Sequence, residues 1–250
     1  MNAFSLPETV AIQTVSETDT EGTFQIEGLY TGYGLTIGNA LRRVLISSLP
    51  GAAITRVKIK GVSHEFSTLE GLGEDIVELT LNLKKVRFSM HSDEPQIVTL
   101  KAKGEQEVTA GDIETNSMVE VVNPDAYIGR LTAKSADLDM ELTIERGLGY
   151  LPVEANKAEK LPIGMIALDA IFTPIVTVNF SVENMRVGDR TDYNRVKFAV
   201  KTDGSITPSA ALSSACAILQ EHYAKIAGVE VRKPAAIAAA APKKAKKAKK

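Results

Sequence analysis

The sequence has few of the side chains from which disulfides and transition-metal centres are built. Its 250 residues include one cysteine, Cys216, and three histidines. A single cysteine excludes an internal disulfide, and three histidines without a cysteine pair leave a zinc site almost without ligands. The His64-Glu65 pair would begin a zinc-protease motif only with a second histidine at position 68, where Thr68 stands. We therefore expect a cytoplasmic protein without a zinc centre.

Long apolar runs are also missing. No stretch reaches the roughly 18 apolar residues that a membrane-spanning helix needs. Residues 1–10 lack the basic start and the apolar core of a signal peptide, so we expect neither membrane insertion nor secretion. The sequence is 44% hydrophobic and 24% charged, which is ordinary for a soluble globular protein. Its length allows one or two domains with sizeable cores.

Positive charge is scarce except at the C-terminal end. Residues 229–250 contain eight basic residues and one acidic residue, a net charge of +7, so the net charge of −2 leaves −9 for the other 228 residues. An acidic body with a basic tail is not typical of a folded domain that binds nucleic acid by itself. We expect the Ala/Lys-rich tail to be disordered. It either increases solubility or makes weak electrostatic contacts with DNA or RNA.

Nucleotide-binding loops are absent as well. Gly32 and Gly34 precede an apolar helical segment, but the dinucleotide-binding pattern needs a third glycine where Ile37 stands, and no Walker motif occurs. A close-packed turn is the favoured interpretation of these glycines.

One predicted strand carries a row of acidic residues. Its apolar face holds Leu138, Met140, Leu142 and Ile144, and its other face holds Asp137, Asp139 and Glu141. Phosphoryl transfer would need such carboxylates to converge on magnesium. Residues two apart on a strand lie about 7 Å apart, and the wet face of a half-buried antiparallel strand has the same spacing. We favour the wet face, and a metal-dependent nucleotidyltransferase is the rival hypothesis.

Periodicity predicts helices near both ends of the chain and a strand-rich middle. Alternating apolar residues predict short strands within the first 33 residues, a strand over 53–66 that turns at Gly61, and several strands over 86–144. A hairpin is predicted from 176–182 and 196–200. Helical spacing predicts helices at 36–49, 67–85 and 208–226.

The segment at 36–49 is the most informative of these helices. Thr36 is placed to cap it, Leu41, Val44 and Leu45 fall on one face, and Pro50-Gly51 ends it. The adjacent Arg42 and Arg43 point about 100° apart, so they cannot both lie on the apolar face. At least one of these arginines must reach another partner.

The helix at 208–226 also carries a broad apolar stripe. Thr207 is placed to cap it, and Pro208 occupies its first position. Such a stripe must be covered by its own domain or by a partner. Cys216 lies at the edge of the stripe, and we interpret it as a small buried residue because no histidine is placed to activate it.

Four blocks of this sequence resemble the amino-terminal domain of the bacterial RNA polymerase alpha subunit. The first runs from Gly38-Asn39-Ala40-Leu41-Arg42-Arg43 to Pro50-Gly51, and the second is Val57 to Lys84 with its His-Glu-Phe-Ser-Thr segment. The third comprises Arg146-Gly-Leu-Gly-Tyr150 and the Pro-Ile-Gly to Thr-Pro segment at 162–174. The fourth is 183–192 with its Arg-Thr-Asp. The blocks follow the family order over about residues 5 to 228.

The resemblance implies an α+β fold in two parts. Residues 1–50 and 176–228 would form a discontinuous dimerisation domain of mixed α+β structure. Residues 51–175 would form an inserted, mostly antiparallel β domain, and residues 229–250 a disordered Ala/Lys-rich tail. The small carboxy-terminal DNA-binding domain that is usual in the family is not found in this sequence, which stops after the lysine repeat. Two explanations are open: the lineage lacks that domain, or the chain is truncated.

The resemblance also implies the function. Such a subunit forms a homodimer that serves as a scaffold for the beta and beta-prime subunits during transcription, has no catalytic residues, and needs no cofactor or metal. It would be cytoplasmic and associated with the nucleoid, and would reach DNA through the holoenzyme or weakly through the lysine tail. The alternative is a stand-alone basic-tailed DNA-binding protein.

The resemblance assigns three groups of contact residues. Contacts to beta are Arg42, Arg43 and Lys84, and contacts to beta-prime are Leu168, Ala170, Thr173 and Pro174. The dimer interface comprises Leu41, Val44, Leu45, Leu212, Ala215, Leu219 and Tyr223. Other interpretations remain open, since the arginines can form ion pairs within the chain, Lys84 can balance a helix end, and Leu168 can belong to the core.

Overall fold

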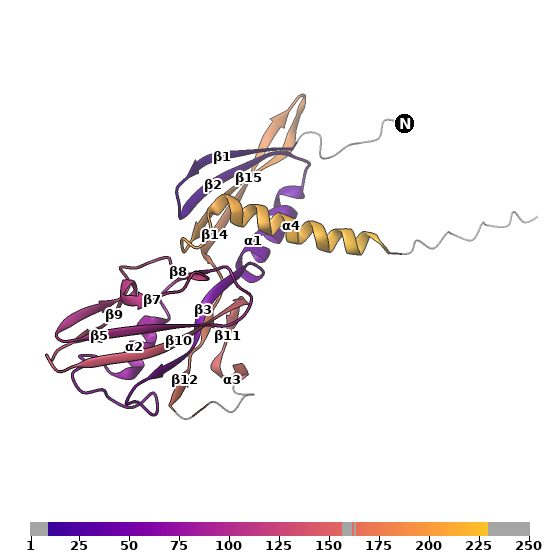
Figure 1. Cartoon of the computed structure of the whole chain (residues 1–250). Coiled ribbons are helices and arrows are strands. Elements are labelled where there is room, and N and C mark those ends of the chain that lie inside the picture. The colour runs from indigo at the N-terminus through magenta and orange to yellow at the C-terminus, as the bar shows by residue number, and fades with distance from the viewer. Residues whose placement is uncertain (1–9, 157–161, 163, 230–250) are drawn as a thin grey trace, which may run out of the picture.

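The computed structural model describes residues 10–156, 162 and 164–229. The described chain forms two parts (Figure 1). Each part has its own hydrophobic core. Helices are few and the strand pairs are antiparallel, so the predicted α+β fold class is confirmed. No helix among the described residues is long and apolar enough to cross a membrane.

The first part is built from both ends of the described chain. Its sheet has the order β1-β2-β15-β14, and helices α1 and α4 cover one face. The elements are β1 (Ala11–Glu17), β2 (Glu21–Leu29), α1 (Tyr33–Ser47), β14 (Ile175–Val187), β15 (Arg190–Thr202) and α4 (Pro208–Ala227). Phe24 and Phe198, paired across β2 and β15, lie in its core beneath Leu45 of α1.

The second part is a larger antiparallel sheet with the order β7-β5-β10-β3-β4-β8, to whose β3 strand β12 also pairs. The sheet elements are β3 (Pro50–Ile59), β4 (Phe88–Met90), β5 (Gln96–Lys103), β7 (Ile113–Glu114), β8 (Val119–Val121), β10 (Asp137–Leu148) and β12 (Met165–Ala167). Around it lie α2 (Ile76–Leu83), β6 (Gln106–Thr109), η2 (Ala110–Asp112), β9 (Tyr127–Leu131), β11 (Tyr150–Leu151), α3 (Val153–Asn156) and β13 (Ala170–Ile171).

The alternating pattern of β10 is confirmed by burial. Leu138, Met140, Leu142 and Ile144 are each at most 1% exposed and join the core of the second part. The hairpin predicted near residues 176–200 is also confirmed, since β14 and β15 pair antiparallel over most of their length.

Two chain crossings connect the parts, one at Leu49–Gly51 and the other at Phe172–Ile175. They pass so closely that a Cβ atom added to Gly51 would lie 1.8 Å from the carbonyl oxygen of Phe172. Only glycine fits there, because that oxygen belongs to the backbone and cannot rotate away. The close approach of the two crossings, not a turn, is therefore what requires the glycine after Pro50.

Helices α1 and α2 begin at different residues from those predicted. Helix α1 starts at Tyr33 after Gly32, whose φ of +86° lets the chain turn, so the prediction that Thr36 caps it is wrong. Thr36 lies inside the first turn and donates to the carbonyl oxygen of Gly32. Helix α2 starts at Ile76 and not at residue 67, because the Asp75 side chain accepts from the N–H of Glu78 at 2.7 Å.

Helix α4 begins where the sequence predicted, with Thr207 at the N-cap and Pro208 in the first turn. The Thr207 side chain makes no capping hydrogen bond. Instead, the carboxylate of Glu17 on β1 accepts from the N–H of Ser209 at 2.8 Å. Glu17, which is distant in the sequence, therefore caps α4 in place of the adjacent Thr207.

Candidate functional site

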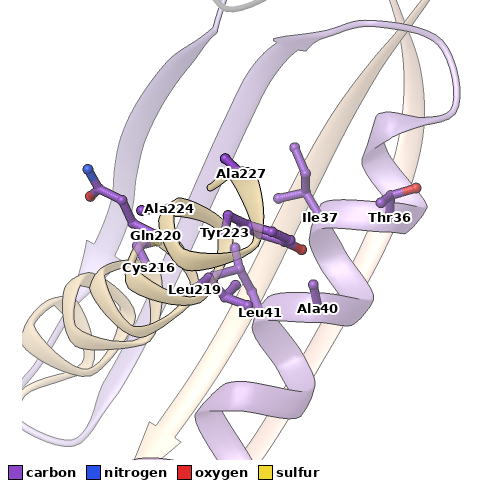
Figure 2. A pocket seen from close by; sticks show the side chains of 10 residues that line it. All are labelled: Thr36, Ile37, Ala40, Leu41, Cys216, Leu219, Gln220, Tyr223, Ala224 and Ala227. Carbon is purple, nitrogen blue, oxygen red and sulfur yellow. The ribbon is translucent and has the colours of Figure 1, made fainter. Parts of the chain in front are cut away.

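An apolar groove of about 620 Å³ lies between α1 and α4. Figure 2 shows its lining, in which Ile37 and Leu41 come from α1 and face Leu219 and Tyr223 of α4. The two helices pack directly at one end, and the C-terminal half of α4 then continues beyond the rest of the first part (Figure 1). The groove lies where α4 leaves its own core.

The projecting half of α4 exposes large apolar side chains. Tyr223 is 58% exposed and Ile226 is 67% exposed. Every residue from Gln220 to Ala227 is exposed, although the helix carried a continuous apolar stripe in the sequence. In a single copy of the chain, this end of the stripe has no cover among the described residues.

The residues predicted for a dimer contact divide into two layers. Leu45 and Ala215 are 0% exposed, and Leu41 and Leu212 are 3% exposed, so these four belong mainly to the core of their own chain. Val44 and Leu219 are half-buried, and Tyr223 is exposed. The outer layer therefore consists of Val44, Leu219 and Tyr223, of which Leu219 and Tyr223 line the groove together with Leu41.

Cys216 lines the same groove and is exposed. The interpretation of Cys216 as a buried residue is therefore wrong in the single chain. Partial desolvation by the neighbouring helix surface raises the pKa of its thiol, which favours the neutral, unreactive form.

The two arginines of α1 lie away from the groove. The half-buried Arg42 donates weakly to Asn39 Oδ1 at 3.4 Å. Arg43 is exposed, and its guanidinium has no hydrogen bond or ion pair with any residue that the structure describes. The helical spacing thus leaves one cation free on the solvent side of α1, as the sequence required of at least one of the pair.

Lys84 is engaged within the chain. It lies at the C-cap of α2, and its Nζ is 2.9 Å from Asp169 Oδ2. The other oxygen of Asp169 accepts from the N–H of Val153 at 2.9 Å. Hydrogen bonding to Lys84 lowers the pKa of Asp169, with the Val153 N–H as the next contribution. This network ties the end of α2 to the segments on either side of residues 157–163.

The segment predicted to face beta-prime is mostly buried. Leu168 is 4% exposed within the core of the second part, and Ala170 is 0% exposed beside Phe172. Pro174 is buried and Thr173 is half-buried at the crossing between the parts. Among its neighbours, Ile171 reaches the surface with 37% exposure.

The acidic row on β10 faces basic residues on both neighbouring strands. Asp137 lies 3.6 Å from Lys103 of β5, and Glu141 lies 3.8 Å from Lys58 of β3. Asp137 and Glu141 are therefore each paired with a lysine across the sheet, whereas no ion pair is seen for Asp139 among the described residues. No group of three or more His, Cys, Asp or Glu side chains in the described part of the chain is placed to hold a metal ion.

One residue that holds the start of α1 had no signal in the sequence. Asn194 of β15 is 7% exposed, and its Oδ1 accepts from the N–H groups of Gly32 and Gly34 at the start of α1. It lies about 160 residues from the helix it caps. No local pattern predicts such a contact, because capping motifs are recognised only by residues next to the helix.

Comparison with known proteins agrees with this arrangement. Residues 57–173 match the family model described as the RNA polymerase Rpb3/RpoA insert domain. The chain is 50% identical over 215 residues to the DNA-directed RNA polymerase subunit alpha of Symbiobacterium thermophilum, covering 86% of this chain and 67% of that protein.

Two further relatives give the same result. The alpha subunit of Alkaliphilus oremlandii is 49% identical over 213 residues, covering 85% of this chain and 67% of the relative. The alpha subunit of Moorella thermoacetica is 50% identical over 214 residues, covering 86% of this chain and 68% of the relative. The chain thus spans about two thirds of the length of these relatives. It belongs to the family of bacterial DNA-directed RNA polymerase alpha subunits.

Proposed function

We propose that two copies of this chain pair through the groove between α1 and α4, and that the pair is the non-catalytic scaffold on which the beta and beta-prime subunits assemble. The observation that carries the proposal is the uncovered apolar end of α4 beside that groove. A helix with such a face needs a partner in water. Because the groove and the protruding helix belong to the same surface, a second copy can supply both halves of an isologous contact.

The proposal places the predicted discontinuous domain, 1–50 with 176–228, at the dimer contact. The sheet β1-β2-β15-β14 and the two helices share one core, which supports treating these segments as a unit. Residues 51–175 then stand apart as the insert. Residues 1–9 and the Ala/Lys-rich tail beyond Val229 lie outside the described residues, and DNA is reached through the assembled enzyme.

The beta contact is assigned to Arg43, with Arg42 beside it. An exposed, unpaired guanidinium on a rigid helix presents five donors to a carboxylate or carbonyl group of a partner. Lys84 is a weaker candidate because Asp169 already neutralises it. For beta-prime, Thr173 and the adjacent Ile171 offer accessible surface, and Leu168, Ala170 and Pro174 support that segment from beneath.

The absence of catalysis is supported by the chemistry of β10. Two of its three carboxylates, Asp137 and Glu141, pair with lysines across the sheet, which competes with binding of a divalent cation. In the assembled polymerase, nucleotide transfer is then assigned to the larger subunits.

Substitution of Arg43 tests the scaffold. We expect Arg43→Ala to remain dimeric by light scattering and to bind purified beta subunit at least about tenfold more weakly, because a central arginine often dominates a protein contact. Arg130→Ala is the matched control, since Arg130 is exposed on β9 of the other part. Capture of beta by Arg43→Ala at the wild-type affinity would refute the assignment.

A further inference from the structure

The first turn of α1 forms one wall of the groove and cannot be capped by its own sequence. Thr36 and Ile37 line the groove, and the N-cap position is Gly32, which has no side chain. The first four N–H groups of a helix have no acceptor within the helix and need one from elsewhere. Without such an acceptor, the end of a helix frays.

Asn194 of β15 supplies the acceptor from the sheet face that α1 covers. Its Oδ1 lies 2.9 Å from the nitrogen of Gly32 and 3.3 Å from that of Gly34. Two converging N–H donors require an oxygen at this position, so the amide orientation is determined, and its nitrogen donates to Asn184 Oδ1 at 3.3 Å. This is the role of an N-cap side chain, performed by a residue of β15.

The contact between Asn194 and the start of α1 depends on the glycine at position 34. A Cβ atom added to Gly34 would lie 2.9 Å from Asn194 Cβ and 2.7 Å from Val182 Cγ1. Glycine therefore allows the helix start to reach the sheet closely enough for the Asn194 side chain to cap it.

A second contact holds the preceding loop to the same end of β15. Thr31 Oγ1 donates to the carbonyl oxygen of Asp192 at 2.8 Å and to its carboxylate at 2.7 Å. Arg190 pairs with that carboxylate at 2.6 Å and lies 4.9 Å from the ring centre of Tyr30. The start of β15 thus fixes the path of the chain into α1 at two successive points.

We propose that Asn194 is a positioning residue for the dimer contact, because it holds the first turn of α1 in the shape that the second copy meets. This inference rests on the function proposed above, in which the groove binds a second copy. Asn194 does not line the groove. Its effect on pairing must therefore pass through Thr36 and Ile37.

Dimer dissociation constants of matched variants test the inference. A lost cap shifts a helix end roughly fivefold toward the frayed state, and an isologous dimer contains two such ends. We expect Asn194→Ala to raise the dissociation constant, measured by analytical ultracentrifugation, about 10- to 30-fold. Amide hydrogen exchange over residues 33–37 should accelerate in the same variant, whereas exchange in β5 should not change.

Two further variants separate capping from a general loss of stability. Asn194→Asp keeps the acceptor oxygen, and the Asn184 amide can turn to donate to it. We therefore expect the dimer dissociation constant of this variant to lie within about threefold of wild type. Val98→Ala creates a cavity in the core of the other part and should leave dimerisation unchanged. The inference is overturned if Asn194→Ala pairs as tightly as wild type, if Asn194→Asp is as weak as Asn194→Ala, or if residues 33–37 exchange normally.

Failure of this inference can be distinguished from failure of the proposed dimer site. If Tyr223→Asp, which changes the groove directly, also leaves the dissociation constant unchanged, the groove is not the contact and the proposed function fails. If Tyr223→Asp disrupts the dimer and Asn194→Ala does not, only the positioning role of Asn194 is refuted.

Discussion

Single residues decide which charges of this chain remain available to partners. Arg43 lies within α1 and Lys84 at the end of α2. Lys84 meets Asp169 at 2.9 Å, whereas the Arg43 guanidinium meets no partner within the described chain. The difference arises because α2 ends against the segment that carries Asp169, while the Arg43 side of α1 faces solvent. Availability for a partner is therefore set by packing around each residue and not by residue type.

The Asp169 carboxylate gives a prediction about pH. Its folded-state pKa is lowered by Lys84, so it stabilises the fold above the unfolded pKa of about 3.9, and that stability is lost as the pH falls through this value toward the folded pKa. We expect Asp169→Asn to lower the free energy of unfolding by about 1–2 kcal/mol at pH 7.

Urea denaturation from pH 7 to pH 3.5 measures this effect. The difference between wild type and Asp169→Asn should narrow as the pH falls, because only the wild type loses a charge interaction. Asp93→Asn is the control, since the Asp93 carboxylate that pairs with Arg146 is 89% exposed and should contribute little. A difference that stays constant over this range would contradict the assigned role of the carboxylate.

Elements of this fold are held by residues distant in the sequence. Asn194 caps α1 and Glu17 caps α4, and both come from strands of the sheet that the helices cover. The sequence therefore predicted that helices form at these places, because apolar spacing is local. The sequence predicted the start of α1 incorrectly, because the residue that caps this helix lies close to it in the folded chain but far from it in the sequence.

Gly38 shows how closely α1 packs on that sheet. A Cβ atom added there would lie 2.6 Å from the ring of Phe180 on β14, which itself stacks near Phe198. Alanine usually stabilises a helix interior relative to glycine by about 1 kcal/mol. Here we expect Gly38→Ala to destabilise the protein by roughly 1–3 kcal/mol, because the helix or the ring must move.

Thermal or chemical unfolding of Gly38→Ala measures this change. Asn39→Ala provides the comparison, since Asn39 is the next residue of α1 and is exposed, and we expect it to be neutral or slightly stabilising. If Gly38→Ala proved as stable as Asn39→Ala, the helix would not pack against Phe180 as described.

At the scale of the whole molecule, two cores are joined by two crossings and one apolar helix end is left uncovered. The chain enters the second part at Gly51 and returns at Phe172–Ile175, and Arg87 of the second part reaches within 3.8 Å of Asp203 after β15. The parts are thus fastened on one side, while α4 points away from this junction (Figure 1). This arrangement keeps the proposed dimer surface separate from the insert.

Tyr223→Asp tests that separation. An isologous contact would bury the new carboxylate of both copies of α4, and each of the two would lose its hydration. We expect this variant to be monomeric at concentrations where wild type is dimeric, by light scattering, with an unchanged unfolding transition of the second part. Glu221→Gln, on the same exposed turn, should pair normally, and equal pairing of all three proteins would exclude the groove as the contact.

The sequence by itself determined the strand-rich middle of the chain, the hairpin of β14 and β15 and the presence of α1 and α4, because these follow from local apolar periodicity. The α+β fold class followed from the resemblance to the family. The motif blocks of the sequence also determined the family, which the comparisons confirmed. Only the tertiary structure decided that Leu45, Ala215 and Leu168 are core residues, that Lys84 is paired, and that Asn194 caps α1. Burial and capping at these positions depend on atoms brought together from distant segments, and no local pattern records which segments will meet.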